Sequence, residues 1–142
     1  MKRHPALAPL SRDHQHTLAV AQRLRRATSE TSQQAVAAFL AVWDLEERLH
    51  FRLEEEILLP ACAGHVEPEN SMILRVLVDH LRIRCAVECL STDTSLPTLH
   101  ALGETLASHV RFEEHEVFPL IEEAVPEAAL HALGERLLSA AQ

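Results

Sequence analysis

The sequence predicts an all-α protein, an up-down-up-down four-helix bundle with a short extra helix at the C-terminus. Apolar residues recur at helical spacing, and only 3 glycines and no tyrosine occur among 142 residues. Prolines and polar clusters divide the chain into a few long segments joined by short connections, which is typical of antiparallel bundles. We expect a single domain over residues 1–142, with its core at about 10–123.

The first half of the chain predicts two helices. Residues 1–9 contain two prolines and predict an extended arm, after which Ser11 is a suitable N-cap for a helix to about Thr28. A second, longer helix is expected from about Gln33 to Leu59, where a proline and a glycine follow. Its buried stripe would hold Ala35, Phe39, Val42, Trp43 and Leu49.

The second half predicts three more helices. Pro68 suits the first turn of a helix that reaches about Leu90, and Pro97 opens another that ends near Pro119 or Glu123. A short C-terminal helix is expected at about 126–141, with its leucines on one side. These leucines would cover either the bundle itself or a second copy of the chain, so a homodimer is one alternative.

Composition and charge exclude several classes of protein. The formal net charge of -8 argues against nucleic acid as a partner, because such binding normally requires a basic face. No apolar run approaches the length of a membrane span, and the first residues lead into no signal-peptide core. We therefore expect no membrane partner and a cytoplasmic location.

The three cysteines do not predict a disulfide framework, because their number is odd and no secretion signal precedes them. Cys85 and Cys89 lie one helical turn apart, so sharing a metal or responding to oxidation is one alternative. We expect instead that both are small, buried apolar residues.

An internal repeat connects the two halves of the chain. Residues 50–60 have the sequence HFRLEEEILLP, and residues 109–119 have HVRFEEHEVFP. One helix before each segment stands an Asp-His pair, at Asp13-His14 and Asp79-His80. The chain is therefore two similar helical hairpins, and antiparallel stacking would direct all these histidines and glutamates to one central point.

The repeated His-x-x-x-Glu pattern predicts a metal site. His50 and Glu54 lie within about 40° of each other on a helix and about 6 Å apart along it, so both can reach one cation. Carboxylates buried without a cation would be costly. Mixed imidazole and carboxylate ligands suit iron, manganese or zinc, while the absence of thiolates argues against a structural zinc site. The expected ligands are His14, His50, Glu54, His80, His109 and Glu113.

Other charged residues lie near this pattern. Arg84 falls near the face of His80 and is expected to pair with a site carboxylate, and Glu116 falls one turn beyond Glu113 as a further ligand or hydrogen-bonding partner. Glu55 and Glu114 are expected to be solvated or helix-pairing residues, although a shifted register would make either one a ligand.

A ferritin-like site is a second interpretation, because ferritin-like bundles use Glu-x-x-His. Glu47 and His50 match that spacing once. The corresponding position of the second hairpin is Leu106, so we reject the ferritin-like interpretation.

The full pattern, Asp-His followed by His-x-x-x-Glu-Glu in each half, resembles the hemerythrin-like, or HHE cation-binding, domain over about Leu10 to Glu123. The resemblance implies a four-helix bundle with a bridged di-iron centre. The four histidines would be terminal ligands, and Glu54 and Glu113 would bridge the two ions. Oxygen-carrying hemerythrins have a second histidine where this chain has Arg84. That difference would leave a metal position open to water, oxygen or peroxide.

These expectations define three functional hypotheses. In the first, two iron ions, or manganese or zinc, bind or sense a small molecule such as oxygen, nitric oxide or peroxide, or report iron availability. In the second, the open position supports an enzyme that removes peroxide or nitric oxide. In the third, metal only helps a structural bundle to fold. The sequence does not decide whether the protein is an enzyme.

Overall fold

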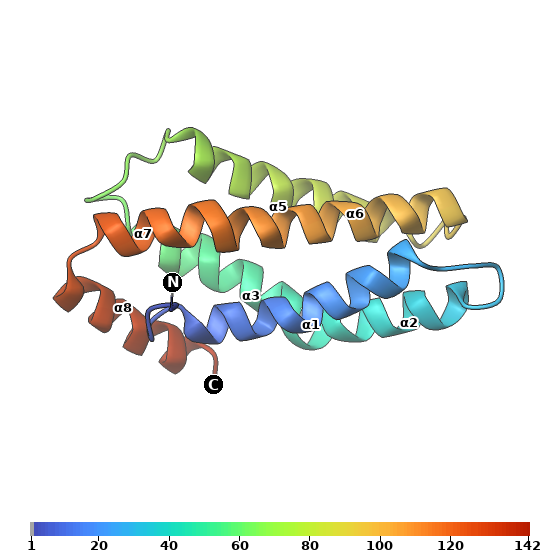
Figure 1. Ribbon diagram of the computed structural model, residues 1–142, viewed down its shortest axis with the longest axis horizontal. Coiled ribbons are helices and arrows are strands. Elements are labelled where there is room, and N and C mark those ends of the chain that lie inside the picture. The colour runs from blue at the N-terminus through green and yellow to red at the C-terminus, as the bar shows by residue number, and fades with distance from the viewer. Residues whose placement is uncertain (1) are drawn as a thin grey trace.

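A computed structural model describes residues 2–142 of the protein. This part of the chain forms five helices (Figure 1). Helices account for 78% of the chain, and no strand occurs within the described residues, so the predicted all-α class is confirmed. The first four helical rods extend along the long axis of the molecule, and the last helix lies across one end. The N- and C-termini both lie at the end that this last helix covers.

The second and fourth rods are composite. The first rod is α1 (Ala8–Arg25) and the third is α5 (Ser71–Cys89). The second comprises α2 (Ser32–Val42), the π-helical turn η1 (Trp43–Glu47), α3 (Arg48–Leu53), the π-helical turn η2 (Glu54–Leu58) and α4 (Leu59–Ala61). The fourth comprises α6 (Leu96–Phe112), the π-helical turn η3 (Glu113–Val117) and α7 (Phe118–Ala124). The last helix is α8 (Glu127–Ala140).

Two predicted helix starts are wrong, the first by four residues and the second by three. The first helix begins at Ala8 with Pro9 in its first turn. Proline is tolerated there because backbone N–H groups of the first turn have no partner within the helix. Ser11 is therefore not the cap, and its hydroxyl donates instead to Glu114 Oε2 at 2.9 Å. The third helix begins after Asn70, whose side chain accepts a hydrogen bond from the Met72 amide at 2.9 Å and caps the helix.

The π-helical turns explain where the predicted burial pattern fails. Each π-helical turn contains about one residue more than an α-helical turn. Beyond it, the buried positions are therefore shifted by one residue along the sequence relative to a continuous α-helix. Leu49 was predicted to be buried but is 37% exposed, whereas Phe51 is fully buried. Likewise Val117 is fully buried, while Glu116 is exposed. The fourth rod also continues through Pro119 to its end at Ala124.

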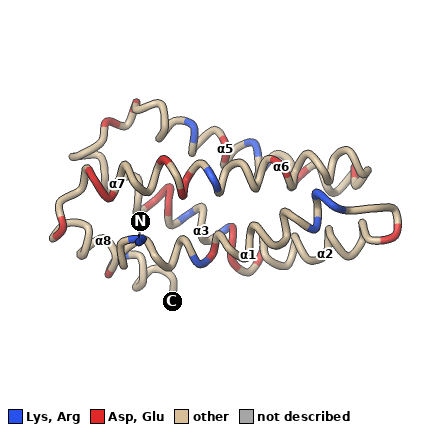
Figure 2. The backbone as a smooth tube through the Cα atoms, viewed as in Figure 1, with Lys and Arg blue, Asp and Glu red and all other residues tan. Residues whose placement is uncertain are grey.

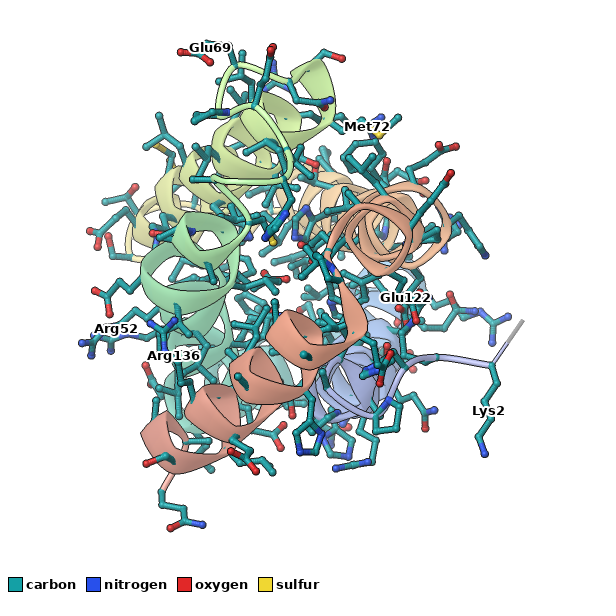
Figure 3. The ribbon with its side chains drawn as sticks, turned by 90° about the vertical axis from the view of Figure 1, so that its left-hand side faces the viewer. Lys2, Arg52, Glu69, Met72, Glu122 and Arg136 are labelled. Carbon is teal, nitrogen blue, oxygen red and sulfur yellow. The ribbon has the colours of Figure 1, made fainter. Side chains whose placement is uncertain are left out.

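Two apolar clusters enclose the middle of the bundle. Along α1, Leu10 belongs to the first cluster and Ala21 to the second, with His14 between them. The buried leucines of α8, Leu130, Leu133 and Leu137, join the first cluster. The C-terminal helix therefore covers the end of its own bundle, as Figure 3 shows, and each buried leucine contributes about 1.5–3 kcal/mol.

The surface carries both signs of charge and two of the three cysteines. Figure 2 shows the basic residues scattered over several helices. Cys62 is buried, but Cys85 and Cys89 are exposed on α5, so the prediction that both are buried is wrong. Their positions lie on the side of α5 opposite its buried residues Ile83 and Val76. None of the helices in residues 2–142 is both long and apolar enough to cross a membrane.

The close approach of α1 and α6 gives a test of the packing. A methyl group added at Gly103 would lie 2.6 Å from the Ala21 carbonyl oxygen and 2.9 Å from the Arg25 amide nitrogen, both backbone atoms. Gly103→Ala is therefore expected to destabilise the protein by about 1–3 kcal/mol, despite the better helix propensity of alanine. Urea denaturation measures this change. Gly64→Ala is the control, because nothing lies within 4 Å of the added carbon, and equal stability of the two variants would contradict the prediction.

Candidate metal centre

The structure brings the six predicted ligand side chains together in the bundle interior. They lie in two overlapping groups whose candidate ligand atoms are within 4.8 Å of one another. One group contains His14, His50, Glu54 and Glu113, and the other contains Glu54, His80, His109 and Glu113. Each of the six residues is no more than 2% exposed. The two glutamates are therefore common to both groups, while each histidine belongs to one.

Each shared glutamate lies between histidines of two different rods. Glu113 Oε1 is 3.1 Å from Nε2 of both His14 and His109. Glu54 Oε1 is 3.4 Å from Nε2 of His50 and 3.2 Å from Nε2 of His80. The Nε2 atoms of all four histidines thus face the carboxylates at the centre.

Many of these buried atoms make no well-formed hydrogen bond among the described residues, although most of them lie 3.1 to 3.4 Å from a neighbouring donor or acceptor. They include Nε2 of His50, His80 and His109 and both carboxylate oxygens of Glu54. Leaving such a group buried and unpaired costs about 1–3 kcal/mol, and more when it is charged. Divalent cations would satisfy these nitrogen and oxygen donors together, so the residues fit a metal site.

A second set of carboxylates contacts the outer nitrogen of each histidine. Asp13 Oδ2 lies 3.1 Å from Nδ1 of His50, and Asp79 Oδ2 lies 3.1 Å from Nδ1 of His109. A carboxylate at Nδ1 fixes the ring and leaves Nε2 free to bind a metal ion. The aspartates of the two Asp-His pairs therefore orient a histidine of the next helix.

The glutamates that follow the shared glutamates serve the other two histidines. Glu55 Oε2 is 2.7 Å from Nδ1 of His80, whereas Glu114 Oε1 is 3.7 Å from Nδ1 of His14, which is an ionic contact beyond hydrogen-bonding distance. The prediction that these two glutamates are solvated or pair along their own helix is wrong, because each is only partly exposed and lies next to a histidine and an arginine of other segments. Their occurrence in both copies of the repeat was the signal that could have identified them.

An arginine side chain donates a hydrogen bond to each of these glutamates, Glu55 and Glu114. Arg84 Nη2 donates to Glu55 Oε2 at 3.1 Å, so it pairs with the carboxylate behind His80 rather than with a shared glutamate. Arg3, in the N-terminal arm, donates to Glu114 Oε2 at 3.2 Å. Glu116 is exposed, and the structure does not bring it to the site, because the π-helical turn η3 rotates it outward.

The carboxylates hold protons on the buried histidines. Burial alone would lower the pKa of His14, but its contacts with Glu113 and Glu114 raise the pKa to about 9. For His109, burial also acts to lower the pKa, but Glu113 and Asp79 raise it to about 10. His50 has a raised pKa for the same reasons, with Glu54 and Asp13 as its main partners. A metal ion would have to displace these protons.

The fold and the site together define an all-helical protein with a buried histidine–carboxylate cluster that can hold cations. The chain matches the family model of the hemerythrin HHE cation binding domain over residues 6–121, and it belongs to this family. No match to a curated protein or to a solved structure was found.

Proposed function

We propose that this protein binds two iron ions between the four long rods of an up-down-up-down bundle. His14 and His50 would hold one ion, His80 and His109 the other, and Glu54 and Glu113 would bridge them. Manganese and zinc accept the same ligands and are the alternative metals. When bound, iron would supply redox chemistry and affinity for small molecules.

The observation that carries this proposal is the pair of overlapping donor groups with unpartnered buried atoms. The same two glutamates belong to both groups, which suits carboxylates that bridge two ions. Both oxygens of Glu54 lack a hydrogen-bonding partner within the described chain, although the side chain is fully buried. A cluster with only a structural role would leave several buried polar groups unpaired.

We further propose that the centre binds or senses a small molecule, with oxygen, nitric oxide and peroxide as candidates. Two histidines and one oxygen of each bridging glutamate would give each ion four ligand atoms, so an ion of higher coordination number would keep positions for a small ligand. The surroundings are aromatic: the Phe51 ring stacks on His80 with centroids 3.8 Å apart, and the Phe118 ring stacks on His14 at 5.4 Å. These rings pack directly against two histidines of the centre and make its surroundings apolar.

The test is to express the protein with iron and to measure metal per chain and the visible spectrum. We expect two iron ions per chain and an oxo-to-iron charge-transfer band near the ultraviolet. Anomalous scattering at the iron and zinc edges, on protein expressed without added metal, identifies the native ion. Fewer than one bound ion per chain, with no such band, would contradict the proposal.

The same preparation separates binding from the other two hypotheses. Multiple turnovers of peroxide or nitric oxide, lost in His80→Ala, would indicate an enzyme. Loss of thermal stability on chelation without any redox chemistry would indicate that metal only supports folding. Stoichiometric, reversible spectral changes are the result expected for a binding or sensing protein.

The outer aspartates give a further prediction for each half of the centre. Asp13→Ala and Asp79→Ala are each expected to weaken metal binding about 10–100-fold, because the paired histidine loses the group that orients it. Competition with a chromogenic chelator measures the affinity. Asp44→Ala is the control, because Asp44 is exposed and its one ion pair among residues 2–142 is with Arg48, at 3.4 Å. Unchanged affinity in both site variants would contradict the assigned role.

A further inference from the structure

A buried carboxylate outside the six-residue set lies beside one half of the centre. Glu47, the last residue of η1, is 2% exposed. Its Oε2 accepts a hydrogen bond from the hydroxyl of Thr17, which is also 2% exposed. The other oxygen, Oε1, is buried and has no partner among residues 2–142. The sequence drew attention to Glu47 only through the rejected ferritin-like spacing.

The position of this pair relates it to the first group of ligands. Glu47 precedes His50 by one helical turn, and Thr17 follows His14 by one turn, so both lie on the faces that carry these histidines. The charge of Glu47 also reaches the site. Burial acts to lower the pKa of His50, but Glu54, Asp13 and Glu47 act to raise it.

The other half of the centre has no such pair. The internal repeat places Ile83 and Leu106 at the positions that correspond to Thr17 and Glu47. Both are fully buried apolar residues of the second cluster. The two halves therefore share their histidines and outer carboxylates but differ here, which makes the two metal positions chemically unequal.

A buried carboxylate close to a ligand position affects anions and neutral molecules differently. It repels an anion strongly, because little solvent is present to screen the charges. It can accept a hydrogen bond from water, hydrogen peroxide or another neutral molecule that carries a proton on oxygen. Thr17 fixes Oε2 of Glu47 and leaves Oε1 available for such a bond.

We propose that Glu47, held by Thr17, is a specificity-determining residue that makes the His14/His50 side of the centre favour neutral, hydrogen-donating ligands over anions. This inference rests on the proposed metal centre. It assigns ligand selectivity to a residue that is not one of the six expected ligands. The hydrogen-bonded pair and the apolar residues of the other half predict that the effect is confined to one metal position.

Azide, a small anion, tests the proposal by spectrophotometric titration of the ferric protein. Glu47→Gln keeps the size of the side chain but removes its charge, and it is expected to tighten azide binding about tenfold. Nitric oxide is a neutral ligand without a hydrogen to donate, so charge repulsion does not act on it. Its affinity for the ferrous protein should therefore change less than about twofold in Glu47→Gln. Leu106→Met is the matched control in the other half and should leave both affinities unchanged.

Iron content and melting temperature are measured for every variant, so that each outcome is informative. Equal azide affinity in the wild type and Glu47→Gln, with full iron in both, would overturn this inference and leave the metal centre standing. Loss of iron from Glu47→Gln would show that Glu47 is a ligand and would also overturn it. A wild type that binds no iron refutes the metal centre and this inference with it. If Glu47→Gln does not fold, Thr17→Val, which frees the carboxylate to move, is expected to change azide affinity in the same titration, and no change would overturn the inference.

Discussion

Glu54→Gln is expected to weaken metal binding by more than about 100-fold and to reduce the metal content of the purified protein from two ions per chain to fewer than one. Glu54 belongs to both donor groups, so the substitution affects both ions at once. The amide keeps the shape of the side chain but cannot offer two anionic oxygens. Glu54 Oε1 lies 3.4 and 3.2 Å from Nε2 of His50 and His80, but neither Glu54 oxygen makes a well-formed hydrogen bond within the described chain. The main expected loss is therefore that of a proposed metal ligand.

The control for this substitution lies two residues away on the same rod. Glu56 is exposed, and its one ion pair within the described residues is with Arg52, one turn earlier, at 3.6 Å. The Arg52 side chain projects from the bundle in Figure 3. Glu56→Gln should retain full metal content, since exposed pairs of this kind contribute little. Metal analysis after gel filtration in the presence of a weak chelator measures both variants. Two ions per chain in Glu54→Gln would contradict the bridging role.

Much of the fold could be predicted from the sequence because its signals are local. Apolar spacing and helix-terminating residues identified all five helices, and Pro126 with the leucines that follow it located α8 almost to the residue. Errors arose where two local signals competed, as with Ser11 and Pro9 at the start of α1. The π-helical turns were not predicted, because an inserted residue has no sequence signature of its own and depends on packing between rods.

In the candidate site, too, the residues that could be predicted depend on one helix, whereas the missed contacts join different helices. The duplication identified the six inward-facing residues, since each His-x-x-x-Glu pair lies on one helix. The outer carboxylates contact histidines of other rods; Glu55, for example, contacts His80. Such contacts depend on how neighbouring helices are aligned. Glu47 was not recognised for the same reason: its partner Thr17 is 30 residues away in sequence, on another helix.

The metal-free protein is expected to lose stability as the pH rises from about 6.5 to about 10. His14 and His109 have an ordinary pKa of 6.5 when unfolded, but pKa values of about 9 and about 10 in the native state. Between these values the native protein binds more protons than the unfolded chain, so increasing pH favours unfolding. This stabilisation is complete below pH 6.5 and disappears as the pH passes through the two native pKa values.

The metal-loaded protein should keep its stability over this pH range, because the ion has already replaced these protons and the unfolded histidines are neutral above about pH 6.5. Its affinity rises with pH as the histidines deprotonate, and zinc at about 1,000 times its dissociation constant would add about 4 kcal/mol, or roughly 12 °C in melting temperature. Calorimetry at pH 6.5 and pH 9, with zinc or with a chelator, should therefore show a difference between loaded and metal-free protein that widens at the higher pH. Glu54→Gln should lose the gain from zinc, and its metal-free form should decline less with pH, because Glu54 helps to raise the pKa of His50 and His109. A metal-free protein that becomes more stable towards pH 9 would show that the buried histidines are not held in their protonated form by Glu113 and its neighbours.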